Sequence, residues 1–217
     1  MKITAIVPAK KDSERCPKKN SIPFYNGFSL VELKIRQLKR INCLDEIILN
    51  TNDENLRTIA HKYNIRYVKR DEKFCQSSSS INDVYENIAQ NSDNDIILYC
   101  NCTNPLIKDD TIIRCIKTYK TIDHEKYQSV NTCQKIKKFI WYKDNPLNYS
   151  YDHMPRSQDL PEYISPNFAI NIISRDLMIK NKQIISRHPY FYIIDDIEGY
   201  DIDNKIDFQI CQTLMRK

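Results

Sequence analysis

Residues 2–20 read KITAIVPAKKDSERCPKKN, and this stretch decides how the rest of the chain is interpreted. Residues 2–9 are an apolar run that predicts a buried strand. The strand leads directly into a loop with five Lys or Arg side chains, which indicates an anion site because cations and hydroxyls bind phosphate and carboxylate groups. The loop contains no glycine, although phosphate-binding loops usually have several. A lysine-rich loop can also be merely solvated, so the loop alone leaves both interpretations open.

Beyond this loop, strand and helix patterns alternate as far as about residue 120. Apolar residues at helical spacing predict helices, and short apolar runs predict strands. The predicted strands are 2–9, 46–51, 66–70 and 95–101, and the predicted helices are 28–41, 53–63, 79–90 and 109–120. Such alternation is typical of an α/β fold, here a Rossmann-like, doubly wound, mostly parallel sheet with helices on both faces.

The pattern changes after about residue 127. Residues 137–166 are rich in aromatic residues, Pro and Asn and have no regular period. We expect one domain over residues 1–217 with 137–166 as an inserted arm, and a long aromatic excursion of this kind is typical of contact with a partner subunit. The remaining predicted elements are strands over 128–136, 167–174 and 190–195 and a closing amphipathic helix over 203–217.

The composition is that of a soluble globular protein, with 41% hydrophobic and 28% charged residues. The net charge of +5 is mild and fits a small anionic substrate as well as nucleic acid. No apolar run approaches the roughly 18–20 residues of a membrane span, so we expect a cytoplasmic protein with no membrane partner. The eight cysteines form no CxxC pair, which predicts reduced and mostly buried thiols. With only two glycines, Asn and Asp are expected at left-handed turn positions.

Polar side chains follow each of the first four predicted strands. In an open parallel sheet, ligands bind at the carboxyl ends of the strands, so these side chains are expected to meet. Several cations with hydroxyl and amide donors suit a polyphosphate. The residues concerned are Lys10, Ser13, Arg15, Lys18, Lys19 and Asn20 after the first strand, Asn50, Thr51 and Asn52 after the second, Arg70 after the third, and Asn101, Thr103 and Asn104 after the fourth.

A second feature lies near the end of the chain, in the sequence DIDNKIDF at 201–208. On a strand, Asp201 and Asp203 would point to the same side. Two such carboxylates repel each other unless a cation lies between them, and oxygen ligands favour Mg²⁺. The alternative is a solvated strand end at which Asp203 caps the last helix. The motifs of P-loop, dinucleotide-binding, GxSxG and HExxH proteins are absent from the sequence.

The chain resembles the acylneuraminate cytidylyltransferase family, the CMP-sialic acid synthetases, with CMP-KDO synthetases as more distant relatives. The family's first loop, PAR-x-G/N-SK-x-x-P-x-KN, corresponds to PAKKDSERCPKKN at 8–20. Its LQPTSPL motif corresponds to YCNCTNPL at 99–106, RQDLP to SQDLP at 157–161, and NGA to NFA at 167–169. Its closing DIDT-x-x-DF corresponds to residues 201–208. These motifs occur in the family's order and cover nearly the whole chain.

The resemblance implies an enzyme that transfers CMP from CTP to a sugar-acid hydroxyl, releases pyrophosphate and uses Mg²⁺. It implies that Lys19 lies at the α-phosphate, that Asp201 and Asp203 bind the metal, and that Lys19 and Asp203 are the catalytic residues. It also implies a homodimer formed through an excursion such as 137–166. The residues implied for CTP binding are Lys10, Ser13, Arg15, Lys19, Asn20, Arg70 and Ser80, and those implied for the acceptor are Asn101, Arg156, Gln158, Asn167 and Asn171.

Several positions depart from the family pattern. Glu14 stands where the family has a second loop Lys, and Asn52 stands at an Asp position. On the acceptor side, Ser157 replaces an Arg, with Arg156 shifted by one, and Asn171 replaces a Tyr. The nucleotide half is therefore better kept than the acceptor half. We expect CTP as the nucleotide and, as acceptor, either a sialic-acid-like nonulosonate or another small acidic or phosphorylated molecule.

Two other classes of function stay open. Glu14 and Asn52 fit a catalytically weakened nucleotide-binding homologue. A nucleic-acid-binding protein would need basic residues interleaved with aromatic ones on one face, and KIKKFIWYK at 135–143 is the candidate for it. We expect the first interpretation, an enzyme without a nucleic-acid partner.

Overall fold

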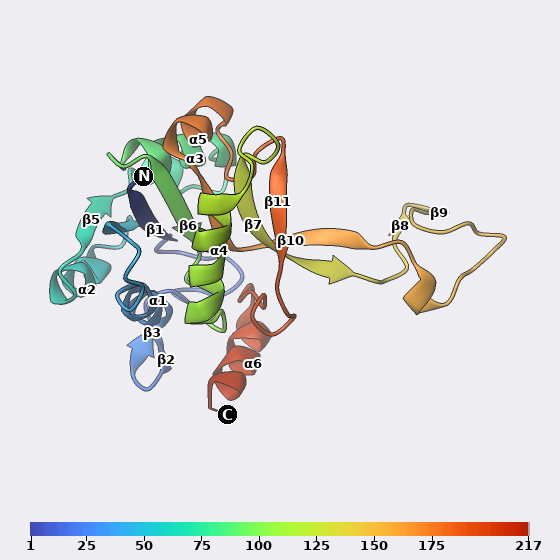
Figure 1. Cartoon of the computed structure of the whole chain (residues 1–217). Helices are drawn as coiled ribbons and strands as arrows, with labels where there is room; N and C mark the ends of the chain where they lie inside the picture. The colour runs from blue at the N-terminus through green and yellow to red at the C-terminus, as the bar shows by residue number, and fades with distance from the viewer. Residues whose placement is uncertain (217) are drawn as a thin grey trace.

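A seven-stranded sheet organises the chain, and the computed structural model describes residues 1–216 (Figure 1). Strand β10 is antiparallel to both of its neighbours, while the other neighbouring pairs are parallel. The α/β, Rossmann-like, mostly parallel sheet expected from the sequence is confirmed. In spatial order the strands are β11 (Pro189–Ile193), β7 (Ser129–Ile136), β10 (Tyr163–Ser174), β6 (Ile96–Cys100), β1 (Ile3–Ala9), β4 (Glu46–Thr51) and β5 (Arg66–Lys69).

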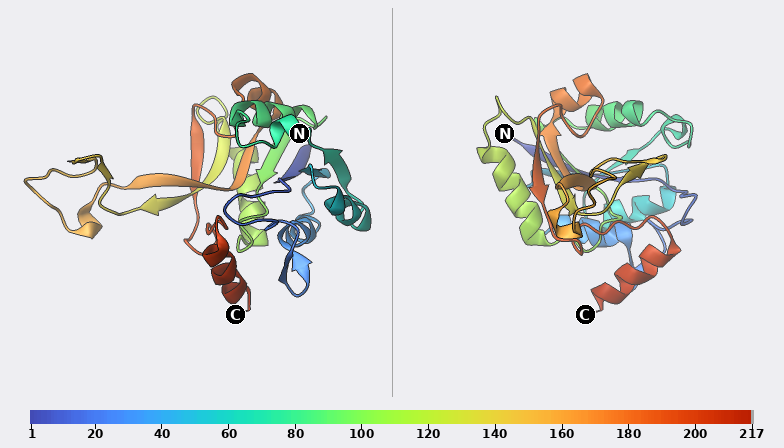
Figure 2. Two further views of the ribbon diagram at one scale, coloured as in Figure 1. Left: turned by 180° about the vertical axis from the view of Figure 1, so that it is seen from behind. Right: turned by 90° about the vertical axis from the view of Figure 1, so that its right-hand side faces the viewer.

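Helices cover both faces of the sheet (Figure 2). Alternate residues of a strand point to opposite faces, so Ala5 and Val7 of β1 enter one core cluster and Ile6 enters the other. Because both faces are buried, the central strands read as continuous apolar runs, which made them predictable. The first cluster holds side chains of α1 (Leu30–Leu38), α2 (Arg57–Lys62), α4 (Asp109–Thr121) and α6 (Lys205–Met215), and the second those of α3 (Ile81–Gln90) and α5 (Arg175–Asn181).

Several element boundaries differ from the sequence-based expectation. The helix expected from residue 28 begins at Leu30, because Ser29 is its N-cap and accepts a hydrogen bond from the Glu32 N–H. Residues 28–29 instead form strand β3 (Phe28–Ser29), which pairs with β2 (Pro23–Tyr25). Helix α5 was not predicted, since its seven residues give too little periodic signal. Three short 3-10 turns, η1 (Glu54–Leu56), η2 (Glu72–Phe74) and η3 (Ser157–Asp159), complete the helical elements of the described residues.

The segment predicted as an arm projects from the body of the molecule, as Figures 1 and 2 show. Strand β10 starts at Tyr163 and pairs with the end of β7, so residues 163–166 belong to the sheet rather than to the irregular part. The irregular part contains one small hairpin of β8 (Trp141–Tyr142) and β9 (Asn145–Pro146). Large apolar side chains are exposed along it, namely Trp141, Tyr142, Leu147, Tyr151 and Met154.

The left-handed backbone positions follow the expectation only in part. Asn26 and Asn64 adopt positive φ angles, as predicted for a chain poor in glycine. Four further positions are occupied by Lys or Phe, namely Lys18, Lys143, Phe168 and Lys182. The prediction for the cysteines is confirmed, since all eight are free and all but Cys43 are buried. Within residues 1–216, no helix combines the length and the hydropathy that crossing a bilayer requires.

Candidate active site

The loop after β1 is held in one conformation by its own backbone and by two amide side chains. Lys18 adopts a left-handed conformation with φ 57°, and its carbonyl accepts from the Ser21 N–H at 3.0 Å. Asn20 is buried; its Nδ2 donates to the Lys10 carbonyl at 3.0 Å. Asn52 accepts from the Lys11 N–H at 2.9 Å, so this departure from the family pattern still supports the loop.

These contacts shape a cavity of about 370 Å³ at the carboxyl end of β1. Three cations of the loop, Lys10, Arg15 and Lys19, line it together with the acidic residues Asp12 and Glu14. Glu14 is turned toward the Ser77 hydroxyl, which donates to its Oε1. The lining residues are Lys10, Asp12, Ser13, Glu14, Arg15, Lys19, Asn20 and Ser77, among them five of the seven residues expected to bind CTP.

Residues 201–203 lie against this loop, far from it in sequence. The buried Lys19 donates through Nζ to the Ile202 carbonyl. Arg15 makes a bidentate ion pair with Asp203, with Nη2 to Oδ1 at 2.7 Å and Nη1 to Oδ2 at 3.0 Å. The two features singled out in the sequence, the cationic loop and the aspartate pair, therefore form one site.

The aspartate pair itself differs from the expectation in two respects. Residues 201–203 do not form a strand, although Ile202 is buried between the two aspartates. Asp203 does not cap the last helix, because Asn204 is the N-cap of α6 and forms a capping box with Asp207. The alternative interpretation of this segment as a mere helix cap is therefore wrong for Asp203.

Asp201 is partly buried, and its buried Oδ1 has no hydrogen-bond partner among the described residues. Burial raises the pKa of Asp201, while the nearby Thr103 hydroxyl and the Lys19 ammonium oppose the rise. A carboxylate oxygen that is buried without a donor is costly, so this position favours a bound cation.

Arg70 and Ser80 were expected to recognise the nucleotide. Arg70 is buried after β5, where its Nε donates to Asn50 Oδ1 at 2.6 Å. Burial lowers the pKa of Arg70, and no ion pair within residues 1–216 includes it. Ser80 is exposed at the start of α3, and it is Ser77 that contacts the loop.

A buried lysine supports the site from behind, and the sequence analysis missed it. Lys34 of α1 is 1% exposed, and its Nζ donates to the Asn104 carbonyl at 3.2 Å and to Gln37 Oε1 at 2.8 Å. Burial lowers the pKa of Lys34. The Asn104 side chain donates in turn to the carbonyls of Gly199 at 3.4 Å and Tyr200 at 3.3 Å. The residues after β6 thus link α1 to the segment that carries the aspartate pair.

A second cavity, of about 650 Å³, is lined by both aspartates. Asn167 is 8% exposed there, and its Nδ2 has no hydrogen-bond partner among the described residues. Gly199 packs closely here: a Cβ on it would lie 2.6 Å from Asn167 Nδ2 and 2.7 Å from Gln134 Cδ, so a larger residue would have to displace the ends of these two side chains. Lining residues include Gln134, Lys135, Lys138, Asn167, Phe168, Asp201 and Asp203.

The structure gathers only part of the expected acceptor residues at this second cavity. Asn167 lines it, and Asn101 directly follows β6 at the same edge of the sheet. Arg156 pairs with Asp159 in the projecting segment, next to Gln158. Asn171 is fully buried inside β10, where its Oδ1 accepts from Asn131 Nδ2 at 2.9 Å.

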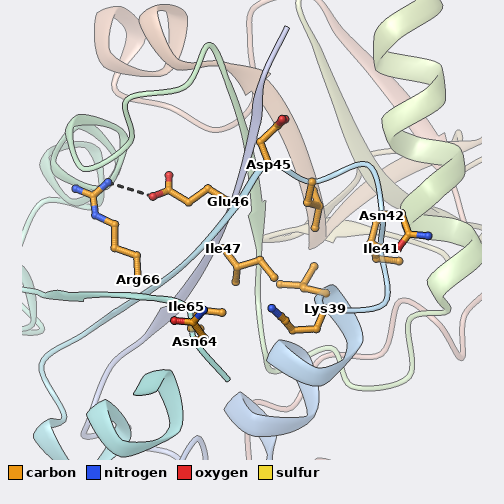
Figure 3. Close-up of a pocket in the computed structure, with 11 residues that line it drawn as sticks. Lys39, Ile41, Asn42, Asp45, Glu46, Ile47, Asn64, Ile65 and Arg66 are labelled. Atoms are coloured by element: carbon orange, nitrogen blue, oxygen red, sulfur yellow. Dashed lines mark hydrogen bonds and ion pairs between the residues drawn. The ribbon is translucent and has the colours of Figure 1, made fainter. Parts of the chain in front are cut away.

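A third cavity, of about 430 Å³, lies at the amino ends of strands β4 and β5 (Figure 3). Glu46 and Arg66, which begin β4 and β5, line it and form an ion pair at 3.3 Å. None of the residues singled out in the sequence reaches this cavity. Since ligands of parallel sheets bind at the carboxyl ends of the strands, the candidate active site is the pair of cavities around the aspartates.

Comparison with protein-family models identifies the family of this chain. A family model described as cytidylyltransferase matches residues 4–209, nearly the whole described chain. The chain belongs to the cytidylyltransferase family. It is accordingly a nucleotidyltransferase that uses CTP, and the first loop and the aspartate pair both lie within the matched residues.

Three relatives of this cytidylyltransferase carry names that describe cytidylyltransferases or CMP-sugar-acid synthases. It is 26% identical to an N-acylneuraminate cytidylyltransferase of Escherichia coli over all of this chain and 52% of that protein. It is 23% identical to a pseudaminic acid cytidylyltransferase of Campylobacter jejuni, covering 100% of this chain and 97% of that protein. A CMP-N,N'-diacetyllegionaminic acid synthase of Legionella pneumophila is 24% identical, with 99% and 97% covered. The chain spans about half the length of the Escherichia coli relative.

Solved structures share the fold of this cytidylyltransferase. A CMP:2-keto-3-deoxy-manno-octonic acid synthetase complexed with CTP superposes with a TM-score of 0.72 at 12% identity, covering 100% of this chain and 99% of that one. A 4-diphosphocytidyl-2C-methyl-D-erythritol synthase from Anaerococcus prevotii gives 0.70 at 16% identity, covering 100% and 96%.

Proposed function

We propose that this cytidylyltransferase transfers CMP from CTP to a hydroxyl of a nonulosonic sugar acid and releases pyrophosphate. The observation that carries the proposal is the contact between the cationic loop and residues 201–203, made by Lys19 and Arg15. The relatives named for neuraminic, pseudaminic and legionaminic acids support a nine-carbon acidic acceptor.

The chemistry required is a displacement at the α-phosphorus. The acceptor oxygen forms a bond to that phosphorus, the bond to the pyrophosphate oxygen breaks, and the acceptor hydroxyl loses its proton. Such transfers depend mainly on positioning and on neutralising charge. Lys10, Ser13 and Arg15 line the cavity where the β- and γ-phosphates would lie. Lys19, fixed between this cavity and the Ile202 carbonyl, would face the α-phosphate, where negative charge develops.

The residues around Asp201 fit a Mg²⁺ ion. Within residues 1–216, no group of three or more His, Cys, Asp or Glu side chains could hold a metal by itself. Mg²⁺ in nucleotide sites is commonly held by one or two carboxylates together with substrate phosphates, so Asp201 and Asp203 suffice. The unpartnered Oδ1 of Asp201 supports this assignment. When bound, the ion would neutralise phosphate charge and lower the pKa of the attacking hydroxyl.

The second cavity is the proposed acceptor site. Its volume of about 650 Å³ lies within the range of small-molecule sites, roughly 300–1,000 Å³. Asn167 offers an unpartnered amide donor, and Lys138 contributes a positive charge to the lining. Arg156 and Gln158 lie in the projecting segment and do not line this cavity. They would contact an acceptor only if it extended toward that segment. Asn171, buried in β10, would act only by supporting the strand.

The alternative interpretation, a catalytically weakened nucleotide-binding homologue, is less well supported by the contacts of the first loop. Glu14 and Asn52, its two arguments, both hold the loop in place, through Ser77 and through the Lys11 N–H. These departures therefore preserve the shape of the nucleotide cavity, which favours an active enzyme.

The assay that tests this function measures pyrophosphate release from CTP and Mg²⁺ with a panel of nonulosonic acids, other sugar acids and phosphorylated small molecules. We expect release only when CTP and a nonulosonic acid are both present, and loss of release when EDTA removes Mg²⁺. Reactions without an acceptor are the control. CTP binding without release for any acceptor would contradict the proposal and favour the weakened homologue. Salt-sensitive binding of an oligonucleotide would favour the nucleic-acid interpretation.

We also propose that the protein is a homodimer formed through residues 137–166. Trp141→Lys is expected to convert the dimer to a monomer at micromolar concentration, because a buried interface does not accommodate an unpaired lysine. Analytical ultracentrifugation measures this change. Ile113→Lys on α4 is the matched control, since Ile113 is 43% exposed and Trp141 is 45% exposed. A wild-type protein that sediments as a monomer would contradict the proposal.

A further inference from the structure

Arg15 and Asp203 form an ion pair with each other, although the proposed reaction assigns Arg15 to the triphosphate and Asp203 to the metal ion. Both oxygens of the Asp203 carboxylate accept from the guanidinium, at 2.7 and 3.0 Å. The same guanidinium lines the cavity proposed for the triphosphate. Asp203 therefore holds a cation of the protein at the place where a metal ion would bind.

The two occupants of Asp203 exclude each other. A divalent cation needs an oxygen of the carboxylate and is repelled by an adjacent guanidinium, so metal binding must displace Arg15. The displacement is easy, because the side chains of Arg15 and Asp203 are 69% and 42% exposed and such exposed pairs are weak. Lys19 differs, since it is buried and donates to a backbone carbonyl, which leaves it in place during the exchange.

We propose, on the basis of the proposed function, that Arg15 is a positioning residue that exchanges partners. It holds Asp203 in the absence of a divalent cation and moves to the triphosphate when the cation takes Asp203. At both stages the Asp203 carboxylate faces a positive group, first the guanidinium and then the metal ion. It also couples the two ligands, since the metal releases the guanidinium that the nucleotide then uses.

The test measures Mn²⁺ binding in the absence of CTP, by the electron paramagnetic resonance signal of the free ion. Arg15→Ala is expected to bind Mn²⁺ about threefold more tightly than wild type, because removing an exposed ion pair removes a competitor of that strength. Arg15→Gln is expected to behave likewise, and Arg15→Lys, which keeps the charge, to stay closer to wild type. In turnover assays at saturating Mg²⁺, Arg15→Ala is expected to raise KM for CTP about tenfold, because a charged contact to phosphate is lost.

Arg40→Ala is the matched control. Arg40 makes a similar bidentate pair with Asp109, at 2.7 and 2.9 Å, away from the two cavities at the aspartates. The Arg40→Ala substitution removes the same charge as Arg15→Ala and is expected to leave Mn²⁺ binding unchanged. The proposal is overturned if Arg15→Ala and Arg15→Gln bind Mn²⁺ no more tightly than wild type, or if Arg40→Ala shows the same gain. Because the binding step needs neither CTP nor an acceptor, a failure of the proposed reaction would be seen separately, as absent pyrophosphate release with the Mn²⁺ result intact.

Discussion

Replacement of Lys19 by Gln is expected to lower kcat for CMP transfer by about 10²–10³-fold, the usual cost of losing one group that stabilises transition-state charge. Gln retains an N–H donor for the Ile202 carbonyl, so the fold of the loop is preserved while the positive charge is removed. A steady-state assay of pyrophosphate release with CTP and the preferred acceptor measures the change. The loss is expected in kcat more than in KM, because charge at the α-phosphate develops mainly in the transition state.

Lys18→Gln is the control for this substitution. Lys18 is the neighbouring residue, is exposed, and has a left-handed backbone that Gln adopts at a similar cost. The control variant is expected to keep kcat within about twofold of wild type, since exposed substitutions away from the site have small effects. A Lys19→Gln variant with nearly wild-type kcat would exclude Lys19 from the catalytic step.

Replacement of Asp201 by Asn is expected to affect activity and stability in opposite directions. Turnover should fall at least about a hundredfold, because the metal contributes several kcal/mol of charge stabilisation. In EDTA, the melting temperature should be equal to or above that of wild type. The reason is that a neutral amide replaces a carboxylate whose buried Oδ1 has no partner within residues 1–216. Pyrophosphate release and thermal unfolding measure the two effects.

Asp93→Asn is the matched control, because the Asp93 side chain is 90% exposed and lines neither cavity of the candidate site. It changes the charge by the same amount and is expected to leave both activity and melting temperature near the wild-type values. A lower melting temperature for Asp201→Asn in EDTA would show that the carboxylate stabilises the fold, against the argument from burial. Undiminished turnover would show that Asp201 holds no metal.

The parts of the fold predictable from the sequence were those with strong local patterns. Strands β1, β4 and β6 are continuous apolar runs because helices cover both faces of the sheet. The start of β10 at Tyr163 was missed, because residues 163–166 gain strand character only by pairing with the end of β7. Such pairing between strands distant in the sequence cannot be predicted from a short stretch of residues.

The candidate site was predictable to a similar extent. The first loop and the aspartate pair have charge patterns that point to their chemistry, and the structure brings them together. Lys34 could not be found, because a lysine in an amphipathic helix is expected to be solvent-exposed, and its contact with the Asn104 carbonyl lies 70 residues away in the sequence. The placement of Asn171 inside the sheet likewise depends on its partner Asn131, 40 residues away.

The absence of glycine from residues 10–20 limits the backbone conformations that this loop samples before a ligand arrives. Glycine loses more conformational entropy on ordering than any other residue, and Gly-rich phosphate loops pay that cost when they close on a ligand. Here Lys18 supplies the one left-handed position within residues 10–20, and hydrogen bonds of the Asn20 and Asn52 side chains hold the loop. Nucleotide binding to this loop therefore carries a smaller entropic cost than binding to a glycine-rich one.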